Sequence, residues 1–332
     1  MRPAAPTSTV RGRRCGARTL LAPADSDWWA TTGDTGGTVT LWDPATVTAT
    51  GVLPGHPEWV NAMAAPAEGT WLATTGYTDG AVTIWDPATA TATATFCAHP
   101  QWVSAMVAPA GGNWLATTGA CDRTVRLWDP VTGALIHTVA VAAHRVTAMV
   151  TPATGTWLAA AHVNGALTIW HPPGSPFRTA STSRLTAMVA PGSGAWLGTS
   201  HVDGTLTVWD PVTGAATHIL PTPQVSAMVA PGNGAWLATS HLDGTVRIWD
   251  SVTGGAILLE SPPCEVTALA VSPDDTWLAA CHLDGTVRIW DPVHTDSWFA
   301  LRAATALSHL AITGSALTAV GEGQLYRVPL RP

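Results

Sequence analysis

Four histidines recur at one position of this sequence, and histidine is both a frequent metal ligand and a proton carrier near neutral pH. Each lies two residues before a turn Asp or Asn: His162, His201, His241 and His282. A zinc ion needs its ligands about 2 Å away, whereas stacked sheets lie about 10 Å apart. If the four belong to successive sheets, as the repeats described below indicate, they cannot share an ion. We therefore expect a surface role or a substitute hydrogen-bonding role, and no metal or other cofactor.

Other residue types that carry chemistry are missing or scattered. The chain has no lysine, which excludes the lysine of phosphate-binding loops, of Schiff bases and of protein kinases. Its five cysteines are odd in number and form no CxxC pair: Cys15, Cys97, Cys121, Cys264 and Cys281. This usage is typical of reduced thiols in a cytoplasmic protein.

The composition is that of a folded chain with a large core. Hydrophobic residues make up 46% of the 332 residues and charged residues 11%, with a net charge of -7. An acidic balance argues against general nucleic-acid binding, which needs a basic face to displace counterions. No apolar stretch is long enough to span a bilayer, and the run Leu20-Leu21-Ala22-Pro23 is too short for a signal peptide.

The four histidines belong to a repeated unit that is recognised by the residues that end one of its expected strands. Seven apolar runs end in Trp at intervals of 39 to 43 residues, and Asp follows in six of them. The pairs are Trp42-Asp43, Trp85-Asp86, Trp128-Asp129, Trp209-Asp210, Trp249-Asp250 and Trp290-Asp291, with Trp170-His171 as the variant. A period near forty residues indicates one structural unit used repeatedly.

One clean copy of the unit lies between Val225 and Glu260. Its four expected strands are Val225–Ala230, Trp236–Ser240, Thr245–Trp249 and Ala256–Glu260. Asp243-Gly244 separates the second and third strands, and Asp-Gly between strands is a strong hairpin signal. Four antiparallel strands per forty residues are typical of one propeller blade. Because the strands are apolar on both sides, a closed ring is expected, in which no blade exposes an apolar face.

These motifs resemble the WD40-repeat family over nearly the whole chain. The abundance of Arg over Lys, with much Ala, Gly, Pro and Thr, indicates a GC-rich genome and a bacterial member. The resemblance implies an all-β, closed β-propeller that serves as a platform for protein interactions, usually without catalysis.

The number of blades follows from the copies. First-to-third-strand units fall at about residues 16–42, 59–85, 102–128, 145–170, 184–209, 224–249 and 265–290. The tail from Thr305 to Val328 fits an eighth unit, with Glu322-Gly323 in the Asp-Gly place, but it lacks a fourth strand. Thr7–Val10 lies where a fourth strand would precede the first unit. We therefore predict eight four-stranded blades, with seven plus an appendage as the alternative. Residues 1–15 would form a basic segment that includes the ring-closing strand, and residues 16–330 the propeller.

The family resemblance also implies a buried hydrogen-bond network in each blade. It links a His, a Ser or Thr of the second strand, the turn Asp and the third-strand Trp. Two units supply all four residues, and these are His56, Thr75, Asp79 and Trp85, then His99, Thr118, Asp122 and Trp128. Thr74 and Thr117 are rival assignments. A His-Thr-Asp set resembles a hydrolase triad, but a set that recurs and ends on an indole donor favours a structural network.

Two tryptophans stand apart from the core pattern. Trp59 and Trp102 each follow a His-Pro pair at the connection into a first strand. In the family this edge belongs to the face that commonly receives peptides, and Trp is a favoured interface anchor. Local packing over the His network is the competing interpretation. The repeated first-strand Met residues and the Trp before each second strand are expected to fill the core.

The sequence thus predicts a non-catalytic, monomeric, cytoplasmic scaffold or sensor module for protein or peptide partners, with no nucleic-acid or membrane partner. One alternative is the C-terminal WD40 sensor portion of a larger signalling NTPase. Another is a propeller enzyme with a site at the channel mouth, and a third is nucleic-acid association through the Arg-rich start.

Overall fold

The fold is known from a computed structural model, which describes most of the chain. The described residues are 10–14, 19–23, 25–32, 37–46, 48–140, 145–171, 177–179, 183–259, 261, 264–292, 297–303, 307, 309–313, 316–321 and 324–329. All regular structure in these residues is β, and none of them forms a helix that could cross a membrane.

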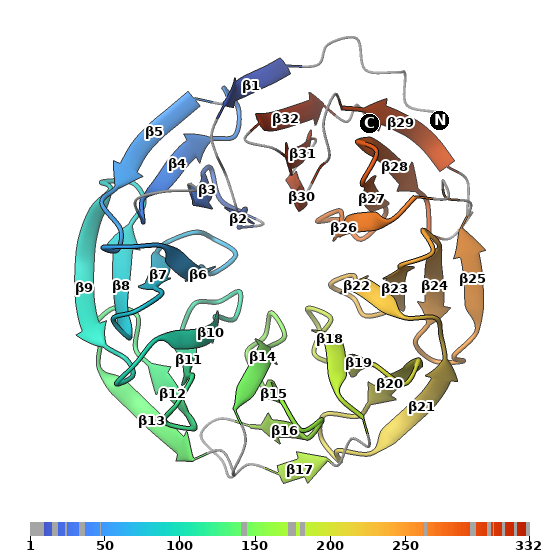
Figure 1. Ribbon diagram of the computed structural model, residues 1–332, viewed down its shortest axis with the longest axis horizontal. Coiled ribbons are helices and arrows are strands. Elements are labelled where there is room, and N and C mark those ends of the chain that lie inside the picture. Colours follow the sequence, from blue (N-terminus) through green and yellow to red (C-terminus); the bar gives the residue numbers. More distant parts are fainter. Residues whose placement is uncertain are drawn as a thin grey trace.

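Within this described part, the strands form eight four-stranded antiparallel sheets arranged around a circle (Figure 1). The first five sheets in chain order are β2 (Thr19–Leu21), β3 (Trp29–Thr32), β4 (Val39–Asp43) and β5 (Thr48–Leu53); β6 (Val60–Ala64), β7 (Leu72–Gly76), β8 (Ala81–Asp86) and β9 (Thr91–Cys97); β10 (Val103–Val107), β11 (Leu115–Gly119), β12 (Thr124–Trp128) and β13 (Leu135–Ala140); β14 (Val146–Val150), β15 (Leu158–His162), β16 (Leu167–Trp170) and β17 (Phe177–Thr179); and β18 (Leu185–Val189), β19 (Leu197–His201), β20 (Thr205–Trp209) and β21 (Ala216–Pro221).

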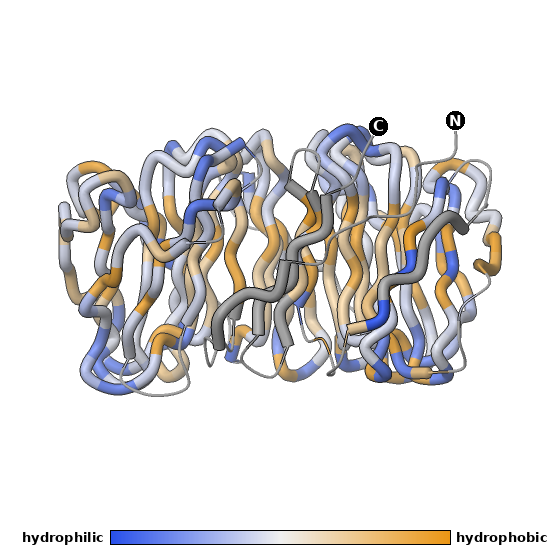
Figure 2. Tube along the Cα trace, turned by 90° about the horizontal axis from the view of Figure 1, so that it is seen from above, coloured by the Kyte–Doolittle hydropathy of each residue, from blue (hydrophilic) through white to orange (hydrophobic). Residues whose placement is uncertain are grey.

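The remaining sheets follow the same plan until the chain ends meet. They are β22 (Val225–Val229), β23 (Trp236–His241), β24 (Val246–Asp250) and β25 (Ala256–Leu259); β26 (Val266–Val271), β27 (Leu278–His282), β28 (Thr286–Trp290) and β29 (Ser297–Arg302); and β30 (His309–Thr313), β31 (Ala316–Gly321) and β32 (Gln324–Pro329) with β1 (Val10–Arg14). Seen from the side, the strands run between two loop-covered faces of a flat disc (Figure 2).

The two chain ends share the last sheet. β1 is antiparallel to β32, with Val10 opposite Arg327 and Arg11 opposite Tyr326. The sequence places this strand at Thr7–Val10, whereas the structure begins it at Val10; residues 7–9 and Glu322-Gly323 lie outside the described residues. The outermost position of this sheet is therefore filled from the opposite end of the chain.

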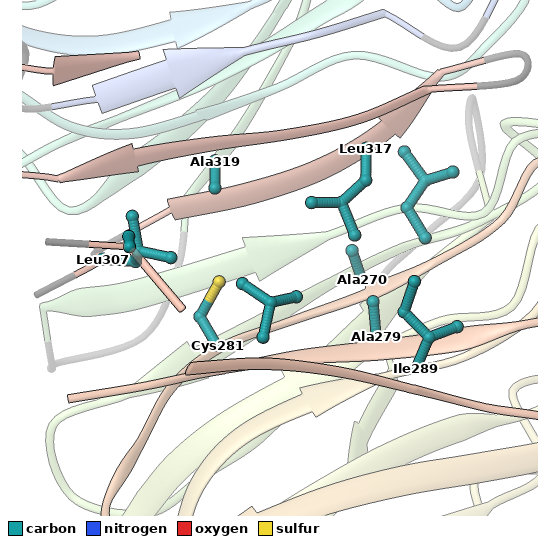
Figure 3. Close-up of a cluster of buried hydrophobic side chains, with 10 residues drawn as sticks. Ala270, Ala279, Cys281, Ile289, Leu307, Leu317 and Ala319 are labelled. Carbon is teal, nitrogen blue, oxygen red and sulfur yellow. The ribbon is translucent and has the colours of Figure 1, made fainter. Parts of the chain in front are cut away.

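Hydrophobic side chains fill the spaces between neighbouring sheets. One cluster joins the sheet of β26–β29 to that of β30–β32 through Cys281, Ile289, Leu307 and Leu317 (Figure 3). Second strands such as β19 are buried along their whole length. A strand that is buried on both faces is expected where each sheet is packed between two others, which agrees with the apolar pattern of the sequence.

Four of the tryptophans that precede second strands do more than fill space. The indole Nε1 of Trp28 donates to the carbonyl oxygen of Gly69 at 2.9 Å. The same bond runs from one sheet to the next at Trp71–Gly112, Trp157–Gly194 and Trp196–Gly234, at 3.2, 2.9 and 2.7 Å. Gly69 has a φ of +63°, and a Cβ there would lie 2.6 Å from the Trp28 Nε1. We refer to these bonds as the Trp–Gly bridges.

Candidate functional site

Two sheets contain a four-residue hydrogen-bond network, but with a different threonine from the one predicted. His99 Nδ1 lies 2.8 Å from an Asp122 carboxylate oxygen, and His99 Nε2 lies 2.9 Å from Thr117 Oγ1. The Trp128 indole donates to the same hydroxyl at 2.8 Å. In the preceding sheet His56, Asp79, Trp85 and Thr74 are joined in the same way.

The assignments to Thr75 and Thr118 are therefore wrong, and the rival residues Thr74 and Thr117 take their places. Thr75 Oγ1 donates to the backbone oxygen of Ala81 at 2.9 Å, and Thr118 Oγ1 is buried without a hydrogen-bond partner. Successive side chains of a strand point to opposite faces, so an error of one residue places the hydroxyl on the wrong side. The pattern TTG offers two adjacent threonines and contains nothing that distinguishes them.

The His99 network has the atom order of a catalytic triad but not its accessibility. His99 is 1% exposed and Thr117 is fully buried. Burial lowers the pKa of His99, although its hydrogen bond to Asp122 opposes that effect. Since no substrate can reach the hydroxyl, this arrangement fixes the blade. Among the described residues no group of three or more His, Cys, Asp or Glu could hold a metal ion.

Later sheets keep the network but take the histidine from another place in the chain. His241 lies at the end of β23, and its Nε2 is 3.0 Å from Thr239 Oγ1, which also accepts the Trp249 indole proton. His241 Nδ1 lies 3.2 Å from the Pro223 carbonyl oxygen. A carbonyl can only accept, so Nδ1 carries the proton and Nε2 accepts from the threonine. His201 makes the same contacts with Thr199 and Ser183.

The four repeated histidines therefore act as substitutes inside the sheets. All four are buried, each within a different sheet. His282 Nδ1 meets the Cys264 carbonyl at 3.1 Å, and His162 Nε2 meets Thr168 Oγ1 at 2.7 Å.

These neutral imidazoles predict acid sensitivity. Burial lowers the pKa of His99, His201, His241 and His282 below the ordinary value of 6.5. As the pH falls below about 6.5, the unfolded chain takes up protons that the folded protein does not yet bind, so the free energy of unfolding decreases. We expect the thermal midpoint to be level above pH 7.5 and to fall between pH 6.5 and 5. An unchanged midpoint across pH 5 to 8 would contradict the buried neutral histidines.

Two of the sheets whose third strand ends in Trp lack the shared hydroxyl. Ala160 and Ala280 stand where Thr117, Thr199 and Thr239 stand in their sheets, each opposite the same first-strand position. Consistent with this, the indole Nε1 atoms of Trp170 and Trp290 are buried without a hydrogen-bond partner.

Restoring the hydroxyl should stabilise the protein. Ala280→Thr gives the Trp290 indole an acceptor, and a satisfied buried hydrogen bond contributes about 1 kcal/mol. Ala280→Val has the same shape without the hydroxyl and serves as the matched control. We expect the threonine variant to unfold at higher denaturant concentration than the valine variant. Equal midpoints would mean that Trp290 gains nothing from an acceptor.

Three aromatic side chains from two neighbouring sheets meet at one face. Trp59 is 48% exposed and Tyr77 is 45% exposed, and their ring centroids lie 6.2 Å apart. Tyr77 stacks on Trp102 with ring centroids 5.9 Å apart and an angle of 6° between the planes. The half-buried Trp102 thus continues the exposed aromatic surface. We call these three residues the aromatic triad.

Backbone hydrogen bonds show that the triad occupies two repeated positions. Tyr77 N donates to the Trp59 oxygen at 3.0 Å, and this bond recurs in five later sheets. The acceptors, which define the loop position, are Trp59, Trp102, Arg145, Arg184, Gln224 and Glu265; the donors, which define the hairpin position, are Tyr77, Ala120, Val163, Val202, Leu242 and Leu283. We call the face that carries both positions the hairpin face.

The sequence prediction found Trp59 and Trp102 but not Tyr77. Tyr77 is one of only two tyrosines in the chain and directly follows the second strand of its unit. Its position two residues before the turn residue Asp79 was the one sequence signal that could have placed it in the hairpin. Only the register of the hairpin, however, shows that this position borders the loop position.

Comparison with known proteins identifies the repeats. A family profile described as "WD domain, G-beta repeat" matches residues 47–86, 90–129, 215–250 and 258–291. The chain contains WD40 repeats within a β-propeller fold. The predicted family and propeller class are thus confirmed, and proteins of this type are generally interaction scaffolds.

The WD40 propeller is also similar to a solved structure over its full length. The crystal structure of the computationally designed Ika8 protein matches with a TM-score of 0.80, 20% sequence identity and 100% coverage of both chains. At this identity the likeness concerns the fold alone. No curated protein matches the sequence.

Proposed function

We propose that this WD40 propeller is a non-catalytic scaffold or sensor module that binds a protein or peptide partner on its hairpin face. The aromatic triad is the observation that carries the proposal. Trp59 and Trp102 are its anchors, and Tyr77 extends the surface between them.

The exposure of Trp59 distinguishes it from the tryptophans of the core. The Trp residues that end the third strands and those that form Trp–Gly bridges are at most 8% exposed. Trp59, at 48%, leaves about half of its surface to water. Burying an aromatic anchor at an interface can contribute 2 kcal/mol or more to binding, so a rigid pair of such side chains is a suitable centre for a partner.

The proposal includes a closed ring of eight blades as a rigid, monomeric platform. The pairing of β1 with β32 supports this closure, and so does the apolar packing between β26–β29 and β30–β32. In a closed ring no sheet leaves an apolar face uncovered. A cytoplasmic location is also part of the proposal, supported by the free thiols of Cys97, Cys121, Cys264 and Cys281.

A comparison of variants on the two faces tests the function. We expect the double variant Trp59→Ala, Trp102→Ala to lose partners that the wild type recovers by affinity capture, while it keeps its fold by circular dichroism. The matched control is Val131→Ala, Val212→Ala. These valines are 80% and 73% exposed and lie in turns after third strands, away from the hairpin face.

The control variant should recover the wild-type set of partners in equal yield. If the tryptophan variant also recovers that set in equal yield, the triad is not the binding site. Loss in both variants would point to a binding mode that does not depend on the hairpin face.

A further inference from the structure

A small pocket lies between β14 and β18, the first strands of the two sheets that follow those of the triad. Its volume is about 190 Å³. Arg184, Thr147, Thr186 and Met188 are among its lining residues. It therefore combines one guanidinium, two hydroxyl-bearing side chains and an apolar wall.

The guanidinium of Arg184 is available for an external anion. Arg184 is exposed, and the basic partners in the ion pairs among the described residues are His56, His99 and Arg126. The carboxylate of Asp203, in the hairpin of the same sheet, instead accepts hydrogen bonds from Thr205. Arg184 thus has no described carboxylate partner.

The hydroxyls of the pocket are held in place by their own donors and acceptors. Thr147 Oγ1 donates to the Ala161 carbonyl at 3.2 Å, and Thr186 Oγ1 lies 2.7 Å from Ser200 Oγ. The methylene stem of an acidic side chain could pack on Met188 and Ala187, while its carboxylate meets Arg184. The arrangement is suited to an anion carried on an apolar stem.

The pocket and the aromatic triad share the hairpin face. Trp102, Arg145 and Arg184 occupy the loop position of three successive sheets. At about 10 Å per sheet or less around the ring, Arg184 lies within roughly 20 Å of Trp102, a span that an extended peptide covers in at most about six residues. The hairpin face therefore changes from aromatic to basic along one direction.

We propose that the pocket receives a Glu or Asp side chain of the same extended peptide whose apolar or aromatic residue sits on the triad. This inference rests on the proposed function and adds the chemistry of the partner, an acidic segment about six residues from its anchor. A single exposed Arg binds a free anion weakly. A carboxylate tethered to an anchored peptide is present at a high effective concentration.

Selection from a random-peptide display library on the immobilised full chain tests this inference. We expect the wild type to enrich peptides with an aromatic or apolar residue and an acidic residue about six positions away. Arg184→Gln should keep the anchor preference and lose the acidic preference. The matched control is Arg302→Gln, which removes another exposed arginine, on the outermost strand β29, and changes the charge equally. This control variant should enrich the same peptides as the wild type.

Binding measurements with synthetic copies of the selected peptides then give the contribution of the acidic residue to affinity. Changing the acidic residue to its amide should weaken binding to the wild type about tenfold, as expected for one charge-assisted hydrogen bond, and leave binding to Arg184→Gln unchanged. An acidic preference that persists in Arg184→Gln, or its absence in the wild type, overturns the inference. Glutarate that binds as tightly as the peptide would reassign the pocket to a small free dianion.

The anchor is tested separately. If Trp59→Ala, Trp102→Ala still selects the same anchor residues while Arg184→Gln loses the acidic preference, the proposed triad is wrong and the pocket stands. If the wild type enriches no peptide, both are overturned.

Discussion

Removal of residues 1–14 is expected to lower the thermal midpoint of this propeller by roughly 8 °C and to cause self-association. The deletion takes away β1, which forms the outermost strand of the sheet that contains β30–β32. About four net stabilising hydrogen bonds of roughly 1 kcal/mol each are lost. In a domain of this size or somewhat smaller, each kcal/mol corresponds to about 2 °C. β32 then becomes an unpaired edge, which is a template for pairing with another chain.

A shorter deletion and a peptide complete the experiment. Removal of residues 1–9 leaves β1 in place and should leave the midpoint unchanged. A synthetic peptide of residues 8–16, added to the protein that lacks residues 1–14, should raise the midpoint again. Size-exclusion chromatography with light scattering detects the association. If the protein that lacks residues 1–14 stays monomeric with the wild-type midpoint, β1 is an appendage and does not close the ring.

Thr117→Val is expected to reduce the free energy of unfolding by about 3 kcal/mol, while Thr118→Val leaves it unchanged or raises it. The two threonines are adjacent and both fully buried, and valine preserves their shape. Thr117 Oγ1 is the common partner of His99 Nε2 and Trp128 Nε1. Removal of this hydroxyl leaves both buried nitrogen atoms without a hydrogen-bond partner, and each such atom costs about 1–3 kcal/mol of stability. Thr118 Oγ1 has no partner, so its removal relieves a buried unsatisfied group.

Urea denaturation at pH 7.5 measures both variants under conditions in which the histidines are neutral. Equal losses at the two positions would show that the effect comes from altered packing. A larger loss of stability in Thr118→Val would mean that the register of β11 is shifted by one residue and that Thr118 is the partner of His99.

Much of the architecture could be predicted from the sequence because the responsible signals are local. The Trp-Asp pairs give the period of the repeat, and Asp-Gly pairs such as Asp243-Gly244 mark the hairpins. Gly244 has a φ of +85° there, a conformation that residues with a side chain rarely adopt. A strand such as β1 is less certain, because its pairing with β32 is non-local and its sequence has no turn at a fixed offset to mark its start.

The details of the site were harder to predict because they depend on the directions of side chains. Whether Thr74 or Thr75 faces His56 depends on the pleat, and two identical residues give no signal. The substitution of His241 for a histidine outside the sheet depends on the Pro223 carbonyl, which the sequence does not place. Tyr77 shares a sheet with Trp59, but it reaches Trp102 only through contact between neighbouring sheets.

The Trp–Gly bridges have a consequence for how this gene could grow or shrink. At the four bridged junctions one unit supplies the Trp donor and the following unit supplies the Gly acceptor, so these junctions use the same pair of parts. A duplicated or deleted unit that carries both parts would arrive with its junctions already compatible, and no new interface would have to evolve. Copy number in such a chain is then limited by curvature at the centre of the circle and not by recognition between neighbours.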